Sequence, residues 1–425
     1  MKVLVIGGGG REHAIVWKLA QSRHVDKIYC APGNAGIAGT AECIDISIGD
    51  FDELVNFVRY EWIDLTIVGP EVPLSMGIAD AFERGGRKIL APVKAAAQLE
   101  ASKVFSKEFM RRHRIPTAEY KVFTSYLHAE DYVRMKDSPI VIKADGLASG
   151  KGVIVAATTD EAVFALKRIM KEKEFGDAGN RVIVEECLQG EEASFMVFTD
   201  GNTIVPMVSS QDHKQVFDGD KGPNTGGMGA YSPAPVITGE LESLVMEKII
   251  HPTINGLREE GIKYKGVLYA GLMIRDGNPS VLEFNCRLGD PETQPVFARL
   301  DSDFVDIALA ICDERLSGLK VEWKKDAAVC VVLASGGYPG QYEKGKVITG
   351  LDEAEQVDDV FVFHAGTEFV DGQIVTSGGR VLGVTATGKD IKAAKEQAYK
   401  AIGQISFEGM HYRKDIADRA LRARE

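Results

Sequence analysis

The segment Val281–Gln294 limits the possible folds of this chain more than any other. Its residues alternate between polar and apolar with a period of two, the pattern of a β-strand with one buried face. One face carries Glu283, Asn285 and Arg287, and the opposite face carries Leu282, Phe284, Cys286 and Leu288. A carboxylate and an amide oxygen one pleat apart suit a hard cation such as Mg²⁺, and a guanidinium beside them suits a phosphate or carboxylate. The segment therefore predicts a strand that carries a metal–phosphate site, although a half-exposed edge strand with solvated polar residues shows the same alternation.

The composition argues against several classes of protein. At 425 residues the chain is long enough for roughly two to four domains. Its net charge of −12 argues against a nonspecific nucleic-acid binder, while leaving room for a local basic cleft. The six cysteines show neither a Cys-x-x-Cys pair nor zinc spacing, which is typical of reduced thiols in the cytoplasm. The apolar start is too short and too glycine-rich for a signal peptide, and no apolar run is long enough to span a bilayer. We therefore expect a cytoplasmic protein with no membrane and no nucleic-acid partner.

The first hundred residues have the pattern of a parallel α/β layer. The apolar run Lys2–Ile6 predicts a buried strand, which is followed by glycines at 7–10 and by a helical stretch over Ala14–Ala20. This order can bring bare backbone N–H groups to an anion at the N-terminus of a helix. Two further predicted strands with the turns that follow them are Lys27–Cys30 with Ala31–Gly36, and Leu65–Val68 with Gly69–Glu71. Ligands bind at such strand ends, although the same segments could be tight turns alone. A nicotinamide site is disfavoured, because no carboxylate follows the second strand to bind ribose hydroxyls.

A lysine within an apolar strand marks the next part of the chain. After a predicted helix over Lys103–Arg114, the strand Pro139–Asp145 contains Lys143 and leads through the glycine-rich Gly146–Gly152 into another apolar run. This is not a Walker loop, because its spacing is one residue short, a glycine follows the lysine, and no helix comes next. A glycine-rich β-hairpin can still close over phosphates with its backbone N–H groups. A buried lysine is costly unless it is paired, which favours a ligand anion as the partner of Lys143.

Two later segments have the composition of functional loops. The strand that begins at Arg181 ends at a turn with four carboxylates, and such a connector can bind a nucleotide base through its backbone and ribose through a carboxylate. Acidic loops are also commonly just solvated. The segment Gly222–Pro233 follows Gln211–Val216 and is rich in Gly, Pro and Asn, so we predict a long shaped loop there rather than a strand or helix.

The order of these segments resembles that of the ATP-grasp carboxylate–amine ligases, and within them the phosphoribosylamine–glycine ligase family. The motifs that carry the resemblance are Gly7–His13, Lys143–Gly152, Glu185–Glu192, Gln211–Lys214, Gly222–Pro233 and Glu283–Gln294. It covers essentially the whole chain, and the Gly222–Pro233 loop and the run Gly289–Gln294 are its most specific parts. Leu288 stands where the family more often has phenylalanine, but this position is on the apolar face, so the difference has little consequence.

The resemblance implies a reaction in which ATP activates glycine as glycyl phosphate. The amine of 5-phosphoribosylamine then displaces phosphate, giving glycinamide ribonucleotide, ADP and phosphate in de novo purine biosynthesis. Such chemistry needs positioning and charge neutralisation more than a protein nucleophile. That fits a chain in which we find no Ser-His-Asp or Cys-His constellation. The implied cofactors are ATP and Mg²⁺ or Mn²⁺, and we expect a monomer.

The resemblance also implies roles for individual residues. The implied metal ligands are Glu283 and Asn285, and the implied catalytic residues are Arg287, Lys143, Asp212 and Lys214. The implied ATP site comprises Lys103, Lys143, Ser149, Gly150, Gly152, Glu185, Glu186, Leu188 and Glu192. The implied substrate site comprises Gly8, Gly9, Asn34, Gly36, Glu71, Asp212 and Arg287. His213 and Lys214 could instead be ordinary loop residues, and His13 could cap its helix.

The predicted fold class is α/β, and α+β in part: an ATP-grasp fold with an N-terminal parallel α/β (pre-ATP-grasp) domain and a small C-terminal α/β domain. The expected domains are 1–102, 103–326 with a mobile flap subdomain over about 121–188, and 327–425. In the last domain, short strands with glycine turns precede a helical stretch from about Asp390. The turns Gly336–Pro339 and Ser377–Arg380 could face the cleft or be surface turns.

Three other functions stay open at this point. Another ATP-grasp ligase, such as a biotin-dependent carboxylase subunit or a formate-using purine ligase, would share the metal strand but lack the Gly222–Pro233 loop. A nicotinamide oxidoreductase would need the missing acidic residue. A nonenzymatic nucleotide-binding or scaffolding protein would bind ATP without glycine-dependent release of ADP.

Overall fold

The N-terminal part of the chain folds as a parallel sheet, which confirms the predicted α/β layer. The structure is a computed structural model and describes residues 1–147 and 152–422. In spatial order the strands are β3 (Glu42–Cys43), β2 (Lys27–Pro32), β1 (Lys2–Gly7), β4 (Leu65–Val68) and β5 (Ile89–Leu90). The helices of this part are α1 (Gly10–Leu19), η1 (Ile37–Gly39), α2 (Phe51–Tyr60), α3 (Glu71–Met76), α4 (Ile78–Arg84) and α5 (Lys94–Ala101). Strand order reverses beside β1, so the turns after β1 and β4 meet at the carboxyl edge where such sheets bind ligands.

Strand β1 is buried on both faces, as expected of a central parallel strand. Leu4 and Ile6 pack into the core shared with the central sheet, whereas Val3 and Val5 pack into a core on the opposite face. Helix α1 begins at Gly10 rather than at the predicted Ala14. The reason is local, because a carboxylate in its first turn accepts the N–H of the N-cap residue and stabilises the start of the helix.

The central part is an antiparallel sheet that contains the predicted metal strand. Its strands in spatial order are β11 (Ile204–Pro206), β10 (Glu191–Thr199), β16 (Gly266–Arg275) and β17 (Asn278–Asn285), and its helices are α6 (Lys103–Arg112), α9 (Gly239–Val245), η4 (Met246–Ile250) and α10 (His251–Glu259). Two details of the strand prediction are wrong. The strand ends at Asn285, so Arg287 follows it, and Leu282 is half-buried and lines a cavity instead of the core. A register shift against β16 leaves Leu282 as the extra residue of a bulge, and Val281 takes the buried position.

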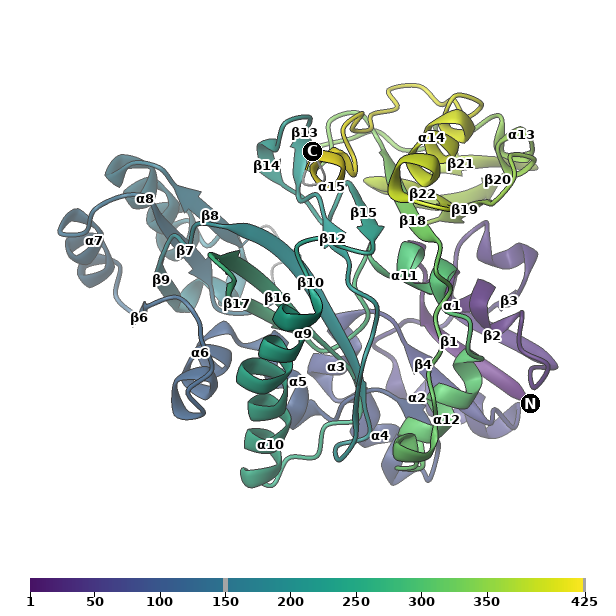
Figure 1. The fold of residues 1–425 in the computed structure, drawn as a ribbon, viewed down its shortest axis with the longest axis horizontal. Helices are drawn as coiled ribbons and strands as arrows, with labels where there is room; N and C mark the ends of the chain where they lie inside the picture. Colours follow the sequence, from purple (N-terminus) through teal and green to yellow (C-terminus); the bar gives the residue numbers. More distant parts are fainter. Residues whose placement is uncertain (148–151, 423–425) are drawn as a thin grey trace.

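A second antiparallel sheet projects from the body of the molecule (Figure 1). Its strands in spatial order are β6 (Tyr120–Phe123), β9 (Val182–Glu186), β7 (Ile140–Ala144) and β8 (Val153–Ala156), with helices α7 (Tyr126–Arg134), α8 (Thr159–Leu166), η2 (Lys167–Lys171) and η3 (Gly176–Asn180). It has its own hydrophobic core, which includes Ile142, Leu166 and Val182. The flap predicted over about 121–188 has nearly these bounds, and its status as a separate, mobile subdomain stays a prediction.

The C-terminal sheet recruits strands from a segment that we predicted to be a loop. Its strands in spatial order are β12 (Gln211–Asp212), β15 (Gly229–Ser232), β18 (Ala327–Ala334), β22 (Arg380–Gly388) and β19 (Val360–His364). The hairpins are β13 (Gln215–Phe217) with β14 (Lys221–Asn224) and β20 (Thr367–Val370) with β21 (Gln373–Thr376), and the helices are α13 (Leu351–Glu355), α14 (Ile391–Ile402) and α15 (Asp418–Arg422). The prediction that Gly222–Pro233 lacks regular structure is therefore wrong, because β15 lies within it and most of β14 does as well. Strand β15 is fully buried and pairs with β18, a distant partner that the local composition does not reveal.

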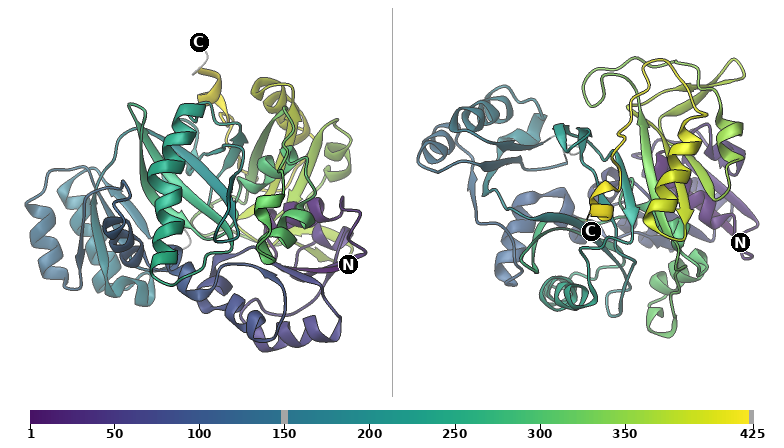
Figure 2. Two further views of the ribbon diagram at one scale, coloured as in Figure 1. Left: turned by 60° about the horizontal axis from the view of Figure 1, so that its bottom comes forward. Right: turned by 45° about the horizontal axis from the view of Figure 1, so that its top comes forward.

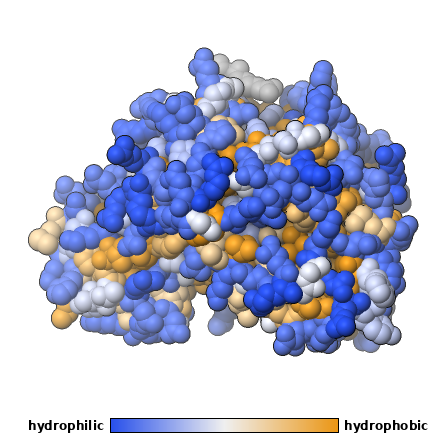
Figure 3. Space-filling view, turned by 90° about the horizontal axis from the view of Figure 1, so that it is seen from below, coloured by the Kyte–Doolittle hydropathy of each residue, from blue (hydrophilic) through white to orange (hydrophobic). Residues whose placement is uncertain are grey.

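The connecting segment α11 (Thr293–Arg299), α12 (Phe304–Cys312) and η5 (Leu316–Gly318) packs against the N-terminal sheet. Figures 1 and 2 place the central sheet between the projecting sheet on one side and the N- and C-terminal parts on the other. Seen from below, hydrophilic residues cover most of the surface, and apolar residues gather on both sides of a notch (Figure 3). Among the described residues, no helix is both long and apolar enough to cross a membrane. The predicted domain boundaries stay predictions.

Candidate active site

A cavity of about 610 Å³ receives side chains from every part of the chain. It brings together most of the predicted site residues, namely Glu71, Lys103, Lys143, Gly152, Glu185, Glu186, Leu188, Glu192, Asp212, Lys214, Glu283, Asn285 and Arg287. Ser149 and Gly150 lie outside the described residues. Of the described residues that were predicted, Gly8, Gly9, Asn34 and Gly36 are not part of its lining.

Glu283 and Asn285 project from the end of β17 into this cavity. Burial alone would raise the pKa of the Glu283 carboxyl, but the nearby ammonium groups of Lys214, Lys103 and Lys143 hold it below its ordinary value. The closest of them, Lys214 Nζ, lies 3.9 Å from Glu283 Oε1. Asn285 Oδ1 accepts a hydrogen bond from Arg287 Nη2 at 3.2 Å. An ionised carboxylate and an oriented amide oxygen on one strand are donors that fit Mg²⁺ or Mn²⁺.

The lysines at the flap side of the cavity surround a single carboxylate. In the structure Lys143 Nζ lies 2.9 Å from Glu185 Oε2, and a ligand anion as a further partner of this lysine stays a prediction. A second lysine, Lys107, lies 3.1 Å from the same oxygen and was missed by the sequence analysis. Burial lowers the pKa of Lys107 to about 8, with Glu185 opposing the shift. The spacing of Lys103 and Lys107 could have revealed it, because residues i and i+4 share one face of a helix.

Lys103 is the first residue of α6 and reaches toward the flap loop. Its Nζ donates to the carbonyl oxygen of Gly146 at 2.9 Å, and burial lowers its pKa. Gly152 lies at the other end of that loop, where its carbonyl accepts the N–H of Ala144 at 2.9 Å. The Gly146 end of the glycine-rich loop is thus held by the Lys103 ammonium group, and the Gly152 end is held by the backbone of β7.

The connector after β9 closes the same end of the cavity. Glu185 is buried, whereas Glu186 is exposed and accepts the N–H of Glu119 at 3.0 Å. Leu188 and Glu192 line the cavity beyond it, and Glu192 Oε2 lies 3.2 Å from Lys214 Nζ. Coulombic attraction by Glu192 is the main reason that the pKa of Lys214 is raised. Lys214 is therefore a fixed cation of the site rather than an ordinary loop residue.

Asp212 lines the same cavity as the end of β17 and lies among acidic groups. Burial, followed by repulsion from Glu292, raises the pKa of the Asp212 carboxyl well above its ordinary value. Glu292 was not predicted, and its Oε1 accepts hydrogen bonds from Tyr269 Oη at 2.5 Å and Ser194 Oγ at 2.9 Å. The sequence signal for Glu292 was present, because this residue belongs to the specific run Gly289–Gln294.

Arg287 is paired with two carboxylates in the cavity. Its Nη2 lies 2.9 Å from Glu100 Oε1, and its Nε lies 3.4 Å from Glu71 Oε2. Burial would lower the pKa of the guanidinium, but these two carboxylates raise it, so the group stays charged. Glu100 was missed, and nothing in its local sequence on α5 distinguishes it from a solvated residue.

The predicted turn residues of the N-terminal sheet have packing partners instead of facing the cavity. Asn34 Nδ2 donates to the carbonyl oxygens of Gly8 at 2.9 Å and His364 at 2.8 Å, while its Oδ1 accepts the N–H of Gly36 at 3.0 Å. The N–H of Gly9 donates to Glu12 Oε2 at 2.6 Å. Asn34 therefore joins the N- and C-terminal parts, and substrate binding by Gly8, Gly9, Asn34 and Gly36 stays a prediction. His13 also joins these parts, because its Nδ1 accepts the N–H of His364 at 2.8 Å.

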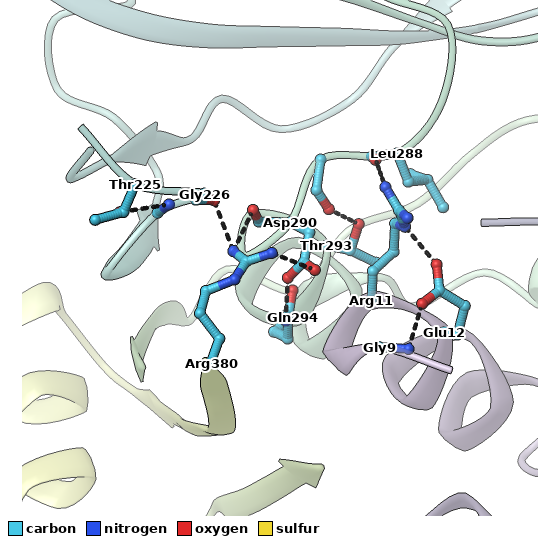
Figure 4. Close-up of polar contacts among 12 residues, drawn as sticks. Gly9, Arg11, Glu12, Thr225, Gly226, Leu288, Asp290, Thr293, Gln294 and Arg380 are labelled. Atoms are coloured by element: carbon cyan, nitrogen blue, oxygen red, sulfur yellow. Dashed lines mark hydrogen bonds and ion pairs between the residues drawn. The ribbon is translucent and has the colours of Figure 1, made fainter. Parts of the chain in front are cut away.

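Arg380 brings the C-terminal sheet into the cavity (Figure 4). Its Nη1 donates to the carbonyl oxygens of Gly226 at 2.6 Å and Asp290 at 2.8 Å, and its Nη2 lies 2.8 Å from Asp290 Oδ2. Two residues before Asp290, the carbonyl oxygen of Leu288 accepts a hydrogen bond from Arg11 Nη1 at 3.2 Å (Figure 4). The turn that ends in Arg380 thus faces the cleft, which the sequence had left open.

The fold and the cavity together define an ATP-grasp protein. Models of the N domain, the ATP-grasp (A) domain and the C domain of phosphoribosylglycinamide synthetase match residues 1–100, 101–293 and 328–419. The chain belongs to the phosphoribosylamine–glycine ligase family.

Named relatives and solved structures agree with this membership. The phosphoribosylamine–glycine ligase of Vibrio parahaemolyticus is 54% identical over 428 residues, covering 100% of this chain and 99% of the relative. That of Salmonella typhimurium is 55% identical over 425 residues, covering 99% of each chain. The crystal structure of the Thermotoga maritima ligase aligns with a TM-score of 0.85 at 34% identity, covering 98% of this chain and 100% of that one. A biotin carboxylase domain from Hydrogenobacter thermophilus, in complex with MgADP, aligns with a TM-score of 0.72 at 15% identity over 97% and 91% of the two chains, a likeness of fold alone.

Proposed function

We infer that this chain joins glycine to 5-phosphoribosylamine with ATP, giving glycinamide ribonucleotide, ADP and phosphate in de novo purine biosynthesis. The observation that carries this inference is the full-length identity of 54% to ligases of that name. The alternative of another ATP-grasp ligase has less support, since the biotin carboxylase domains share only the fold. The cavity chemistry agrees with carboxylate activation, because it combines several cations with oxygen donors and has room for a nucleotide.

The first step transfers the terminal phosphoryl group. A carboxylate oxygen of glycine attacks the γ-phosphorus of ATP, the bond to the bridging oxygen breaks, and ADP leaves with that electron pair. We assign Lys103 and Lys143 to the phosphates, with Ser149, Gly150 and Gly152 over the γ-phosphate. Arg287 is held in place by Glu100 and Glu71, so it can stabilise charge on the transferring group without reorganising.

The second step forms the amide. The amine of 5-phosphoribosylamine attacks the carbonyl carbon of glycyl phosphate, the bond to phosphate breaks, and the nitrogen loses a proton. We assign Asp212 and Lys214 to this substrate region, because both line the cavity beside the metal strand. Binding of 5-phosphoribosylamine by Gly8, Gly9, Asn34, Gly36 and Glu71 is the weaker part of the proposal, since Glu71 alone among them lines the cavity.

We assign the nucleotide and metal sites in the same way. Glu185, Glu186 and Leu188 would meet the base, and Glu192 the ribose hydroxyls. Glu283 and Asn285 would hold Mg²⁺ or Mn²⁺, and the ion would neutralise charge on the phosphates. The support for the metal site is that the Glu283 carboxylate and the Asn285 amide oxygen face the same cavity as the lysines assigned to the phosphates.

The test follows the oxygen atoms of glycine. With ¹⁸O in the glycine carboxylate, each turnover should transfer one label to inorganic phosphate, and release of ADP should require both glycine and freshly made 5-phosphoribosylamine. Release of AMP and pyrophosphate, or label found only in the amide product, would exclude the glycyl-phosphate route.

A further inference from the structure

A buried cluster of three charges lies at the flap end of the cavity, and the proposed reaction gives a role to only two of them. Lys107 and Lys143 both approach Glu185 Oε2, at 3.1 Å and 2.9 Å. All three residues are buried: Lys107 is 2% exposed, Lys143 is 6% exposed and Glu185 is 3% exposed. Two ammonium groups on one carboxylate leave one positive charge in excess. Because burying charge is costly, the second lysine calls for an explanation.

The free oxygen of this carboxylate is an acceptor without a donor. Glu185 Oε1 is buried and has no hydrogen-bond partner among the described residues. A buried carboxylate oxygen left without a donor is unfavourable, and a donor from a bound molecule would satisfy it. Glu185 lines the cavity next to Cys187 and Leu188, so such a donor can come from a ligand in the cavity.

Lys143 Nζ is slightly closer to Glu185 than Lys107 Nζ is, but Lys107 has the shorter hydrogen bond to a second partner. Lys107 Nζ donates to Thr117 Oγ1 at 2.7 Å, and Thr117 Oγ1 donates to the carbonyl oxygen of Val281 on β17, also at 2.7 Å. Lys143 Nζ has the carbonyl oxygen of Leu282 as its other partner, at a longer 3.1 Å. If Lys143 turns toward a phosphate, Lys107 remains as the counter-charge that keeps Glu185 in place.

We propose that Lys107 determines the base specificity of the nucleotide site by holding Glu185 in place as an acceptor for the amino group of a 6-aminopurine. This rests on the proposed function for the use of a nucleoside triphosphate. A 6-oxopurine presents a carbonyl oxygen at the same position, where it faces the carboxylate oxygen without a hydrogen between them. A 6-oxopurine is therefore rejected for two reasons: it lacks the hydrogen bond to Glu185, and it leaves the buried carboxylate oxygen without a donor. Lys107 is a positioning residue, because it acts through Glu185.

The experiment compares binding of ATP and inosine triphosphate, with Mg²⁺, to the full chain by calorimetry. The two nucleotides differ at the 6-position of the base, where inosine carries an oxo group. The wild type should prefer ATP. Lys107→Gln should weaken the binding of ATP about tenfold and change the binding of inosine triphosphate little. The preference for ATP therefore falls about tenfold. Lys143→Met should weaken the binding of both nucleotides alike and leave the preference for ATP unchanged. Lys107→Arg should keep the preference that Lys107→Gln loses.

A matched control is Lys121→Gln, which removes an exposed lysine from the neighbouring strand β6 and should leave both affinities unchanged. Equal weakening of both nucleotides by Lys107→Gln, or an unchanged preference, would overturn the proposal. If Lys107→Gln does not fold, Glu185→Gln replaces it, because an amide can donate to a 6-oxo group. That variant should shift the preference toward inosine triphosphate at least about tenfold, and an unchanged preference would again overturn the proposal. A wild type that binds neither nucleotide would count against the proposed function as well.

Discussion

The two ends of the cavity hold their cations in different ways. At the flap end the cations are lysines, each bound through a single ammonium group, such as Lys103 on the Gly146 carbonyl. At the junction with the N- and C-terminal parts they are arginines, and different guanidinium nitrogens of Arg287 and of Arg380 bind partners from separate segments. A lysine can exchange one partner for a ligand oxygen, whereas a bridging guanidinium fixes the geometry of the groups around it. We therefore expect the flap end to carry binding and the junction to carry positioning and stability.

The largest expected effect tests the metal strand. Glu283→Gln keeps the shape of the side chain but removes the charge that a divalent cation needs. Turnover should fall on the order of 10²–10³-fold while the melting temperature stays within a few degrees of wild type. Steady-state rates across a Mg²⁺ series measure this, with Asn285→Ala expected to raise the Mg²⁺ requirement. Wild-type turnover of Glu283→Gln at limiting Mg²⁺ would disprove the metal assignment.

Arg287 is the cation that links the two ends. Arg287→Lys keeps the charge but loses the fork that contacts Glu71 and Glu100, so phosphoryl transfer should slow on the order of 10–100-fold. Affinity for ATP should change much less than the rate. Single-turnover release of phosphate, measured beside calorimetric ATP binding, separates the two quantities. If ATP affinity falls as much as the rate does, Arg287 contributes to nucleotide binding and not to phosphoryl transfer.

The two ends also differ in how far the sequence could predict them. Glu283 and Asn285 lie two positions apart on β17, so their shared direction follows from strand periodicity, whereas Arg287 lies just after the end of the strand. The contacts of Arg380 span 154 positions to Gly226 and 90 to Asp290, and no local pattern encodes such pairs. The bulge at Leu282 and the recruitment of β15 by β18 were missed for the same reason, because both depend on a partner strand. The parallel sheet was predictable, since apolar runs and glycine turns are local signals.

Arg380 tests the junction. Arg380→Met keeps most of the stem but removes the Arg380 donors from Asp290 Oδ2 and the Gly226 carbonyl, which should lower the free energy of unfolding by about 3 kcal/mol. Turnover should fall about tenfold, because the loop that carries Lys214 is held through Gly226. Urea unfolding and steady-state kinetics measure the two effects. A matched control is Arg168→Met, which breaks the more exposed pair with Glu174 on the flap and should change stability by less than about 1 kcal/mol. Equal stability changes in Arg380→Met and Arg168→Met would contradict the expectation that the junction contributes more to stability than the flap does.

The smallest expected effect at neutral pH, and a separate test of the junction, concerns the buried imidazoles of His13 and His364. Burial, together with repulsion by His364, lowers the pKa of His13 to about 3, and burial lowers the pKa of His364 to about 4. The unfolded chain takes up these protons near the ordinary pKa of 6.5, whereas the folded chain excludes them until far lower pH. Each imidazole therefore contributes stability that is present above about pH 6.5 and is lost as the pH falls toward the folded pKa.

The loss should amount to about 2 kcal/mol for each imidazole between pH 7 and pH 5. His13→Asn isolates one of them, because the asparagine oxygen can still accept the N–H of His364 but does not titrate. Urea unfolding at pH 7, 6 and 5 should show that the variant loses about 2 kcal/mol less than the wild type over this range. The pH dependence of other groups is common to both proteins and cancels in this difference. A variant that loses as much stability as the wild type would show that His13 is not held neutral at the junction, and that the N- and C-terminal parts are joined less tightly there than at Arg380.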